Sequence, residues 1–203
     1  MLRACLVDMG GVLLSFSHER MCRQMAEVCG VSTDAMRRLV MHSGLQADFE
    51  SGLPASEYHR RIEDAIDTVV DRDSLLEAHC DIFELNAPVA RLIEGLAAAG
   101  VRLVLLSNTD ASHFEFVRRR FEVLDRFDDF VLSYRIGTMK PGDAIYRAAL
   151  QAIGCRPGEC FYTDDIADYV AAGRRWGLPA EQFTDAASLA AHFGQRGVRL
   201  DLS

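Results

Sequence analysis

The sequence predicts an α/β fold, a doubly wound parallel sheet with a small helical subdomain inserted after the first strand. Three observations lead to this prediction. Continuous apolar runs recur along the chain, as is typical of strands buried on both faces of a parallel sheet. Amphipathic segments of helical period alternate with these runs. A long stretch with helical patterns only, about residues 14 to 84, separates the first run from the others.

Four apolar runs are predicted to form the sheet, and each ends on a small or polar residue. In chain order they are Leu2–Val7, "VRLVLLS" (101–107), "FDDFVLS" (127–133) and "ECFYTDD" (159–165). Three helices are expected between or after them, in "APVARLIEGLAAAG" (87–100), "GDAIYRAALQAIG" (142–154) and "IADYVAAGRRWG" (166–177). Glycines at the ends of the first two segments are typical helix stops. Strand alternating with helix therefore favours a doubly wound core.

The stretch after the first strand reads as four amphipathic helices without a convincing strand. They lie in "SHERMCRQMAEVCG", "STDAMRRLVMHSG", "ASEYHRRIEDAIDTVV" and "RDSLLEAHCDIF". The candidate N-caps are Ser17, Ser32, Ser56 and Asp73. The stretch is too long for a simple crossover connection. We expect a helical cap subdomain over 14–84 and an α/β core made of 1–13 and 85–203.

Composition narrows the class of protein. The 203 residues carry a formal net charge of −8, which argues against nucleic acid as a partner because phosphate backbones select clustered Lys and Arg. No apolar run approaches the roughly 20 residues that span a bilayer, so no membrane partner is expected. The six cysteines are scattered without a CxxC pair, which favours free thiols in a reducing compartment, with the cytoplasm as the expected location.

Polar and charged side chains follow the predicted strands at the edge where parallel strands bind ligands. They are Asp8, Ser107, Asn108, Asp164 and Asp165, with Lys140 shortly after the third strand. Each alone has an ordinary explanation as a cap or turn residue. Together on one rim they favour function. Three converging carboxylates repel one another unless a cation lies among them, and all-oxygen ligation suits Mg²⁺.

The same residues suit phosphoryl transfer. Ser107 and Asn108 offer neutral hydrogen-bond donors and Lys140 offers a positive charge, so a phosphoryl group could be neutralised before an anion approaches it. Asp8 would then attack phosphorus and form an aspartyl phosphate that water hydrolyses. The glycines after Asp8 allow a close backbone approach, so the carbonyl of Gly10 can serve as a metal ligand.

Four short motifs resemble those of the haloacid dehalogenase superfamily of hydrolases. They are "LVDMGGVL", "LLSNT", "MKPGDAIY" and "FYTDDIAD", and their order and spacing match along essentially the whole chain. The resemblance implies a Rossmann-like core with a helical cap between the first two motifs. The nearest branch resembles the α-glucose-1-phosphate phosphatases and the N-terminal phosphatase domain of soluble epoxide hydrolases. A magnesium-dependent phosphatase of small phosphorylated metabolites, such as sugar phosphates, is therefore expected.

The resemblance also implies a role for each motif residue. Asp8 is the expected nucleophile and a magnesium ligand, together with the carbonyl of Gly10 and the carboxylate of Asp165. Asp164 would support the ion or its waters. The transferred phosphoryl group would be bound by Ser107 and Asn108, and Lys140 would neutralise it and hold Asp8 in place.

The first motif departs from the usual phosphatase pattern at Gly10. Family phosphatases have an Asp there that acts as general acid and base, a contribution of about 10²–10⁴-fold in rate. Two explanations stay open. The enzyme favours substrates with good leaving groups, such as sugar 1-phosphates or acyl and aryl phosphates. Alternatively, a cap residue supplies the proton, with His18, His42 and Glu50 as candidates.

A second departure is Tyr169, where many relatives have Asn or Asp; Asp168 is a candidate substitute. Two other functions compete with the phosphatase. A 2-haloacid dehalogenase would use the same aspartate without a metal, but such relatives lack the acidic pair found here. A catalytically weakened protein with an interaction or regulatory role would keep the fold and lose the reaction. The physiological substrate and the oligomeric state are left open by the sequence.

Overall fold

Five parallel strands form the central sheet of the structure, a computed structural model that describes residues 2–198. In spatial order they are β5 (Asp129–Leu132), β4 (Arg102–Ser107), β1 (Ala4–Val7), β6 (Cys160–Asp164) and β7 (Ala180–Gln182). The central strand is β1, in which Leu6 is in register with Val104 on one side and Tyr162 on the other. Because the strands are parallel, their carboxyl ends meet at one edge of the sheet.

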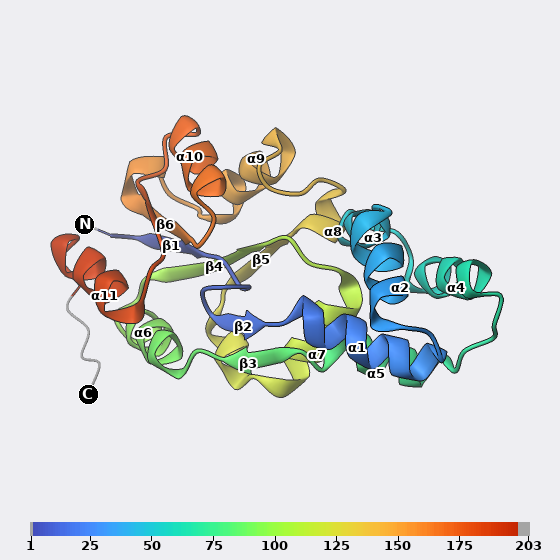
Figure 1. The fold of residues 1–203 in the computed structure, drawn as a ribbon. Helices are drawn as coiled ribbons and strands as arrows, with labels where there is room; N and C mark the ends of the chain where they lie inside the picture. Colours follow the sequence, from blue (N-terminus) through green and yellow to red (C-terminus); the bar gives the residue numbers. More distant parts are fainter. Residues whose placement is uncertain (1, 199–203) are drawn as a thin grey trace.

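Helices cover both faces of the sheet and create two hydrophobic cores (Figure 1). One core packs against α6 (Ala87–Ala98), α7 (Ala111–Arg120) and α11 (Ala186–Gln195); the other packs against α9 (Asp143–Ala152) and α10 (Ala167–Arg175). Successive side chains of β1 alternate between them: Cys5 belongs to the first core and Leu6 to the second. This alternation explains the continuous apolar run of the strand and confirms the predicted fold class.

A helical insertion, residues 14–85, lies to one side of the sheet (Figure 1). Its ends are β2 (Leu14–Phe16) and β3 (Phe83–Leu85), which pair antiparallel. Between them are α1 (His18–Cys29), α2 (Thr33–Arg37), a π-helical turn η1 (Arg38–His42), α3 (Leu45–Glu50), α4 (Ala55–Ile66) and α5 (Arg72–Cys80). The short connecting elements elsewhere are η2 (Glu122–Arg126), α8 (Ser133–Ile136) and η3 (Pro157–Glu159).

Several local predictions were wrong. The insertion contains two strands, β2 and β3, although none was expected there; each has three residues and pairs only with a segment far away in sequence. The edge strand β7 and the short helix α3 were also missed, because neither is long enough to show a period. Ser17 and Ser32 are N-caps as predicted, but α4 begins after Pro54 and Asp71 caps α5 in place of Ser56 and Asp73.

Within residues 2–198, no helix combines the length and apolar character needed to cross a membrane. Residues 1 and 199–203 of the predicted core lie outside the described residues. The fold thus brings the residues that follow β1, β4 and β6 to one edge, with the insertion beside them.

Candidate active site

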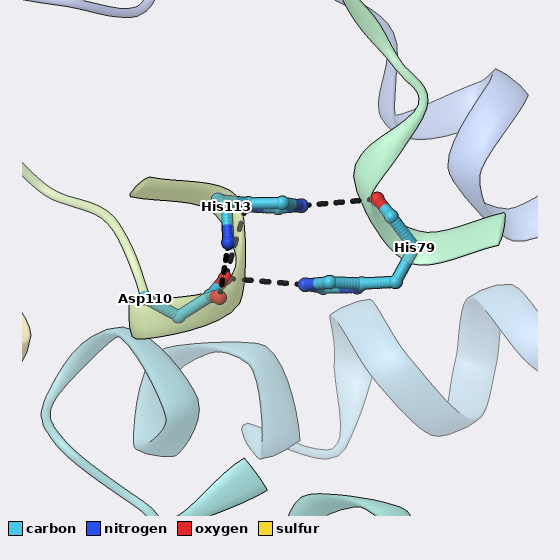
Figure 2. Close-up of side chains that lie close together, drawn as sticks. All are labelled: His79, Asp110 and His113. Carbon is cyan, nitrogen blue, oxygen red and sulfur yellow. Dashed lines mark hydrogen bonds and ion pairs between the residues drawn. The ribbon is translucent and has the colours of Figure 1, made fainter. Parts of the chain in front are cut away.

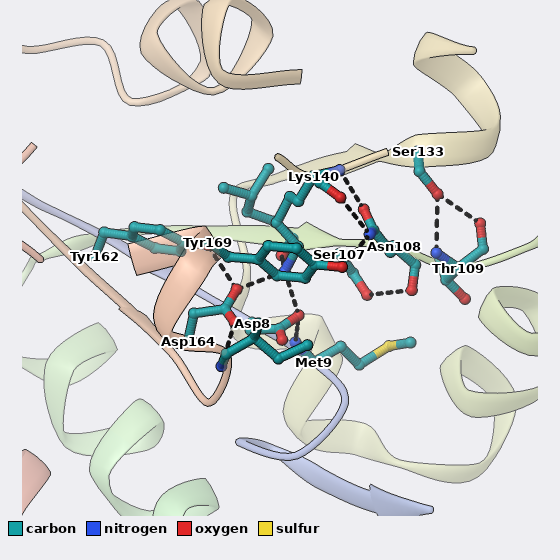
Figure 3. A network of polar contacts seen from close by, with 12 residues as sticks. Asp8, Met9, Ser107, Asn108, Thr109, Ser133, Lys140, Tyr162, Asp164 and Tyr169 are labelled. Carbon is teal, nitrogen blue, oxygen red and sulfur yellow. Dashed lines mark hydrogen bonds and ion pairs between the residues drawn. The ribbon is translucent and has the colours of Figure 1, made fainter. Parts of the chain in front are cut away.

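Asp8 follows the central strand and lies at the carboxyl edge of the sheet (Figure 3). Only 5% of the residue is exposed. Its Oδ1 accepts a hydrogen bond from the backbone N–H of Met9 at 2.7 Å and lies 2.9 Å from Nζ of Lys140. Burial raises the pKa of Asp8 to about 7; Lys140 opposes the shift, whereas the neighbouring Asp164 and Asp165 add to it. The negative charge of Asp8 is therefore unfavourable in this environment, and a nearby cation would stabilise it.

Lys140 is a buried cation between two carboxylates. Its Nζ lies 2.9 Å from Asp8 Oδ1 and 2.6 Å from Asp164 Oδ2, and it donates to the carbonyl of Leu106 at 3.1 Å. These contacts use all three ammonium donors. Burial alone would lower the pKa of Lys140, but the two carboxylates outweigh it and hold the pKa above its ordinary value. Lys140 is therefore charged and fixed in position.

Asp164, at the end of β6, is fully buried. Its Oδ2 accepts hydrogen bonds from Lys140 and from the hydroxyl of Tyr162 at 2.5 Å, and its Oδ1 accepts one from the N–H of Ile166 at 2.9 Å. Burial and the adjacent carboxylate raise the pKa of Tyr162 well above its usual range, so this hydroxyl stays a donor. Asp164 anchors Lys140 as well as contributing negative charge.

Asp165 is the more accessible acid of the pair, and its position depends on glycine. Gly11 has φ +77°, and a Cβ added there would lie 2.3 Å from Asp165 Oδ2. Glycine therefore meets both a backbone and a steric requirement. Carboxylate oxygens of Asp8, Asp164 and Asp165 lie within 4.8 Å of one another, and among residues 2–198 Lys140 is the only cation that contacts them. Three hard oxygen ligands and this unbalanced charge fit Mg²⁺.

Asn108, after β4, links the second and third motifs. Its Oδ1 accepts from the N–H of Lys140 at 2.7 Å, and its Nδ2 donates to the Lys140 carbonyl at 3.1 Å and to the hydroxyl of Tyr169 at 3.3 Å. The ring of Tyr169 has its centroid 5.1 Å from Lys140 Nζ, within reach of a cation–π interaction. Many relatives have Asn or Asp at the position of Tyr169, and Asp168 was expected to substitute for that side chain. Asp168 is exposed and does not line the cavity described next, so this expectation is wrong.

A cavity of about 210 Å³ opens over these groups, between the sheet edge and the insertion. Of the predicted site residues, the lining includes Asp8, Gly10, Asn108 and Asp165. The other three lie buried beneath the lining: Ser107, Lys140 and Asp164. The hydroxyl of Ser107 donates to the carbonyl of Asn108 at 3.2 Å. The structure thus brings all seven residues together, with four in direct contact with the space for a ligand.

The insertion contributes much of the cavity wall. Its lining residues are Phe16, His18, Glu50, Ile82 and Phe83. The third proton-donor candidate of the sequence, His42, is exposed on η1 and does not line the cavity. Sequence reasoning missed Tyr162 and Thr109, since a Tyr within an apolar strand and a Thr in a turn carry no distinctive signal.

A second buried cluster joins the insertion to the core and was not predicted (Figure 2). Oδ2 of Asp110 lies 2.9 Å from Nδ1 of His113 and 3.1 Å from Nε2 of His79. Nε2 of His113 lies 3.0 Å from the carbonyl oxygen of His79, and the two rings stack with centroids 4.0 Å apart. Both nitrogens of His113 face acceptors, so this ring is an imidazolium and has no lone pair to offer a metal.

Comparisons with known proteins agree with this geometry. A family model described as haloacid dehalogenase-like hydrolase matches residues 2–177. A phosphatase of Mycobacterium tuberculosis is 28% identical over 184 residues, covering 87% of this chain and 85% of the relative. D-ribitol-5-phosphate phosphatase of Bacteroides thetaiotaomicron is 23% identical over 190 residues, covering 90% of this chain and 92% of the relative.

Solved structures show the same fold. A haloacid dehalogenase family enzyme from Bacteroides thetaiotaomicron superposes with a TM-score of 0.83 at 21% identity, covering 95% of this chain and 98% of that one. A structure of a predicted family hydrolase from Porphyromonas gingivalis gives a TM-score of 0.78 at 24% identity, covering 99% and 100%. These structures confirm the predicted core architecture, and the family model with the two phosphatase relatives confirms the predicted family and enzyme class. The chain belongs to the haloacid dehalogenase-like hydrolases.

Proposed function

We propose that this hydrolase is a magnesium-dependent phosphatase that acts on small phosphorylated metabolites through an aspartyl phosphate on Asp8. The observation that carries the proposal is the placement of Asp8. It is a carboxylate at the floor of the cavity, held by Lys140 and the Met9 N–H, with two further carboxylates close by. The phosphatase names of the two relatives support the same reaction.

The metal would be held by Asp8, Asp165 and the carbonyl of Gly10, with Asp164 supporting it. When bound, Mg²⁺ would neutralise the phosphate oxygens and so allow the anionic Asp8 to approach. A family enzyme of the same fold from Bacteroides thetaiotaomicron has been solved in complex with magnesium and inorganic phosphate, which supports this assignment.

The reaction would proceed in two displacements on phosphorus. An oxygen of Asp8 forms a bond to phosphorus as the ester P–O bond breaks and its electron pair leaves on the alcohol oxygen. Water then attacks the aspartyl phosphate and releases phosphate and the carboxylate. Lys140 keeps Asp8 in one orientation and balances the developing charge, while Asn108 and Ser107 orient the phosphoryl group.

We propose that residues 14–84 act as the cap that selects substrate, with the rest of the chain as the catalytic core. Phe16, His18 and Glu50 of this segment line the cavity. The cavity volume, about 210 Å³, fits a small metabolite. Sugar and polyol phosphates are candidate substrates, as the relative named for D-ribitol-5-phosphate indicates for that protein. All six cysteines are free, which supports a cytoplasmic location.

A screen of phosphorylated metabolites with Mg²⁺ tests the proposal, with Asp8→Asn and a chelator as controls. We expect phosphate release by the wild type, loss of about 10³-fold or more in Asp8→Asn, and loss on chelation. Turnover that persists in Asp8→Asn would contradict the nucleophile. Activity on haloacids that survives the chelator would instead favour the dehalogenase alternative.

A further inference from the structure

The position two residues after the nucleophile is Gly10 and carries no acid. A Cβ added at Gly10 would lie 2.8 Å from Cε1 of Phe16, so a longer side chain there would require the exposed Phe16 ring to shift. The proton for the departing oxygen must therefore come from elsewhere in the cavity or from water.

Four titratable side chains line the cavity besides the carboxylates Asp8 and Asp165: His18, Glu50, His113 and Tyr169. Geometry removes His113 from the candidates. Its Nδ1–H is directed at Asp110 and its Nε2–H at the carbonyl of His79, at 2.9 and 3.0 Å. Both protons are committed to buried acceptors, and moving either would leave a buried acceptor unsatisfied.

The acidity of Tyr169 and His18 disqualifies them as well. Burial raises the pKa of Tyr169 above its ordinary value, which makes its hydroxyl a poorer acid. Burial lowers the pKa of His18, with a further lowering by the positive charge of His113. Burial thus favours the neutral imidazole, the form of His18 that has no imidazolium proton to donate.

Glu50 is the remaining candidate, and its carboxyl group has a free oxygen. It is the last residue of α3, and Gln46 Nε2 donates to its Oε1 at 3.0 Å. Within residues 2–198 no hydrogen-bond donor contacts its Oε2. Burial raises the pKa of Glu50; the Gln46 bond and the charges of His113 and Lys140 oppose this rise, while Asp110 adds to it. Burial thus favours the protonated form of this carboxyl, which is the form that a proton donor needs.

The backbone of Glu50 is hydrogen-bonded to the core beside Thr109, in the turn that follows β4. Oγ of Ser133 lies 2.6 Å from the Glu50 carbonyl oxygen and 3.0 Å from that of Thr109, and it accepts from the Thr109 N–H at 2.9 Å. Two residues later Gly52, at φ +106°, passes close to α8, where an added Cβ would lie 2.9 Å from the carbonyl oxygen of Tyr134. The backbone of Glu50 is therefore fixed against the core through Ser133 rather than carried on a loose loop.

We propose that Glu50 donates the proton to the leaving oxygen in place of the acid missing at Gly10; this inference rests on the proposed phosphatase function. As Asp8 displaces the ester oxygen, the Glu50 carboxyl transfers its proton to that oxygen and becomes a carboxylate. In the second step it takes a proton from the attacking water, so that phosphate and Asp8 are released and Glu50 is restored. The sum is ester plus water giving alcohol plus phosphate.

Two substrates of similar shape and different leaving groups test the proposal. The leaving group of para-nitrophenyl phosphate departs without protonation, whereas that of benzyl phosphate needs a proton. With Mg²⁺, Glu50→Gln should lower kcat/KM about 10²-fold or more for benzyl phosphate and less than about tenfold for para-nitrophenyl phosphate. The ratio of the two rates does not depend on the folded fraction of the variant. Glu19→Gln, an exposed α1 residue outside the cavity, should leave the ratio unchanged.

The outcomes separate the inference from the function on which it rests. Equal losses on both substrates would overturn the role of Glu50 and leave the phosphatase intact. If His18→Gln rather than Glu50→Gln selectively lowers kcat/KM for benzyl phosphate, His18 is the proton donor and the proposed role of Glu50 is overturned. A wild type that hydrolyses neither ester with Mg²⁺ would contradict the proposed function itself, and the inference with it.

Discussion

Two buried ionic clusters of this protein have opposite charge patterns. At the sheet edge one cation, Lys140, lies between the carboxylates of Asp8 and Asp164. Between insertion and core one anion, Asp110, lies between the rings of His113 and His79. Burial and its interaction with the charged His113 lower the pKa of His79 to about 4, so only His113 is charged. The first cluster thus has an excess negative charge, and the second is neutral.

This difference separates a binding site from a structural contact. The excess charge at the sheet edge borders the cavity through Asp8 and Asp165, where a cation and a phosphate can enter. Asp110 and His79 are fully buried, and their hydrogen bonds connect α5 of the insertion to α7 of the core. Buried ion pairs are costly to break even where their net contribution to stability is small. Both clusters therefore tolerate mutation poorly, but only one should control the reaction.

Replacement of Lys140 by Met is the largest perturbation that we expect. It leaves two buried carboxylates without their cation, which should cost about 3–5 kcal/mol in the free energy of unfolding. Loss of charge stabilisation should also lower kcat about 10²–10³-fold. Urea denaturation and steady-state phosphatase assays measure the two effects. Mg²⁺ should restore part of the stability, because the metal supplies a counter-charge to the same carboxylates; an unchanged unfolding free energy would contradict the role of Lys140.

Replacement of Asp110 by Asn should reduce stability and spare the chemistry. Asn keeps the N-cap of α7 but removes the charge that pairs with His113, so the loss should lie near the lower end of about 3–5 kcal/mol. The cost is smaller than for Lys140→Met because His113 can lose its proton once Asp110 is gone. In Lys140→Met the two buried carboxylates remain close together without a cation. The folded fraction should retain most of its kcat on para-nitrophenyl phosphate. A loss of kcat as large as that of Lys140→Met would show that the two clusters act as one unit.

The two clusters also differ in how far the sequence predicted them. Asp8, Asn108, Lys140 and Asp165 follow strand ends or a short loop, and parallel topology brings such positions together regardless of side-chain detail. The contact of His79 with Asp110 depends on how α5 packs against α7, which no local period encodes. The same limit explains why β2 and β3 were missed, since each exists only through the other. The position of Glu50 likewise depends on the contact of α3 with Ser133.

The smallest effect at neutral pH should come from His79→Gln, which changes how stability depends on pH. Gln can keep one donor toward Asp110, so the cost at pH 7 should be about 1 kcal/mol. The pKa of His79 falls from 6.5 to about 4 on folding, so the unfolded chain takes up its proton first. The stability due to the neutral ring is complete above pH 6.5 and is lost as the pH falls toward 4.

Chemical denaturation between pH 7 and pH 4 measures this dependence for wild type and variant. Groups common to both proteins, including Asp8 with its raised pKa, cancel in the difference, so the wild type should lose more stability than His79→Gln between pH 7 and pH 4 because Gln does not titrate. The raised pKa of His113 acts in the opposite direction: its stabilisation is complete below pH 6.5 and is lost as the pH rises through its folded value, so it adds nothing to a loss of stability on acidification. The stability due to the lowered pKa of Asp110 is lost only as the pH falls below about 3.8, the ordinary pKa of the group. Parallel curves for the two proteins would therefore mean that His79 takes up its proton without disturbing the contact between insertion and core.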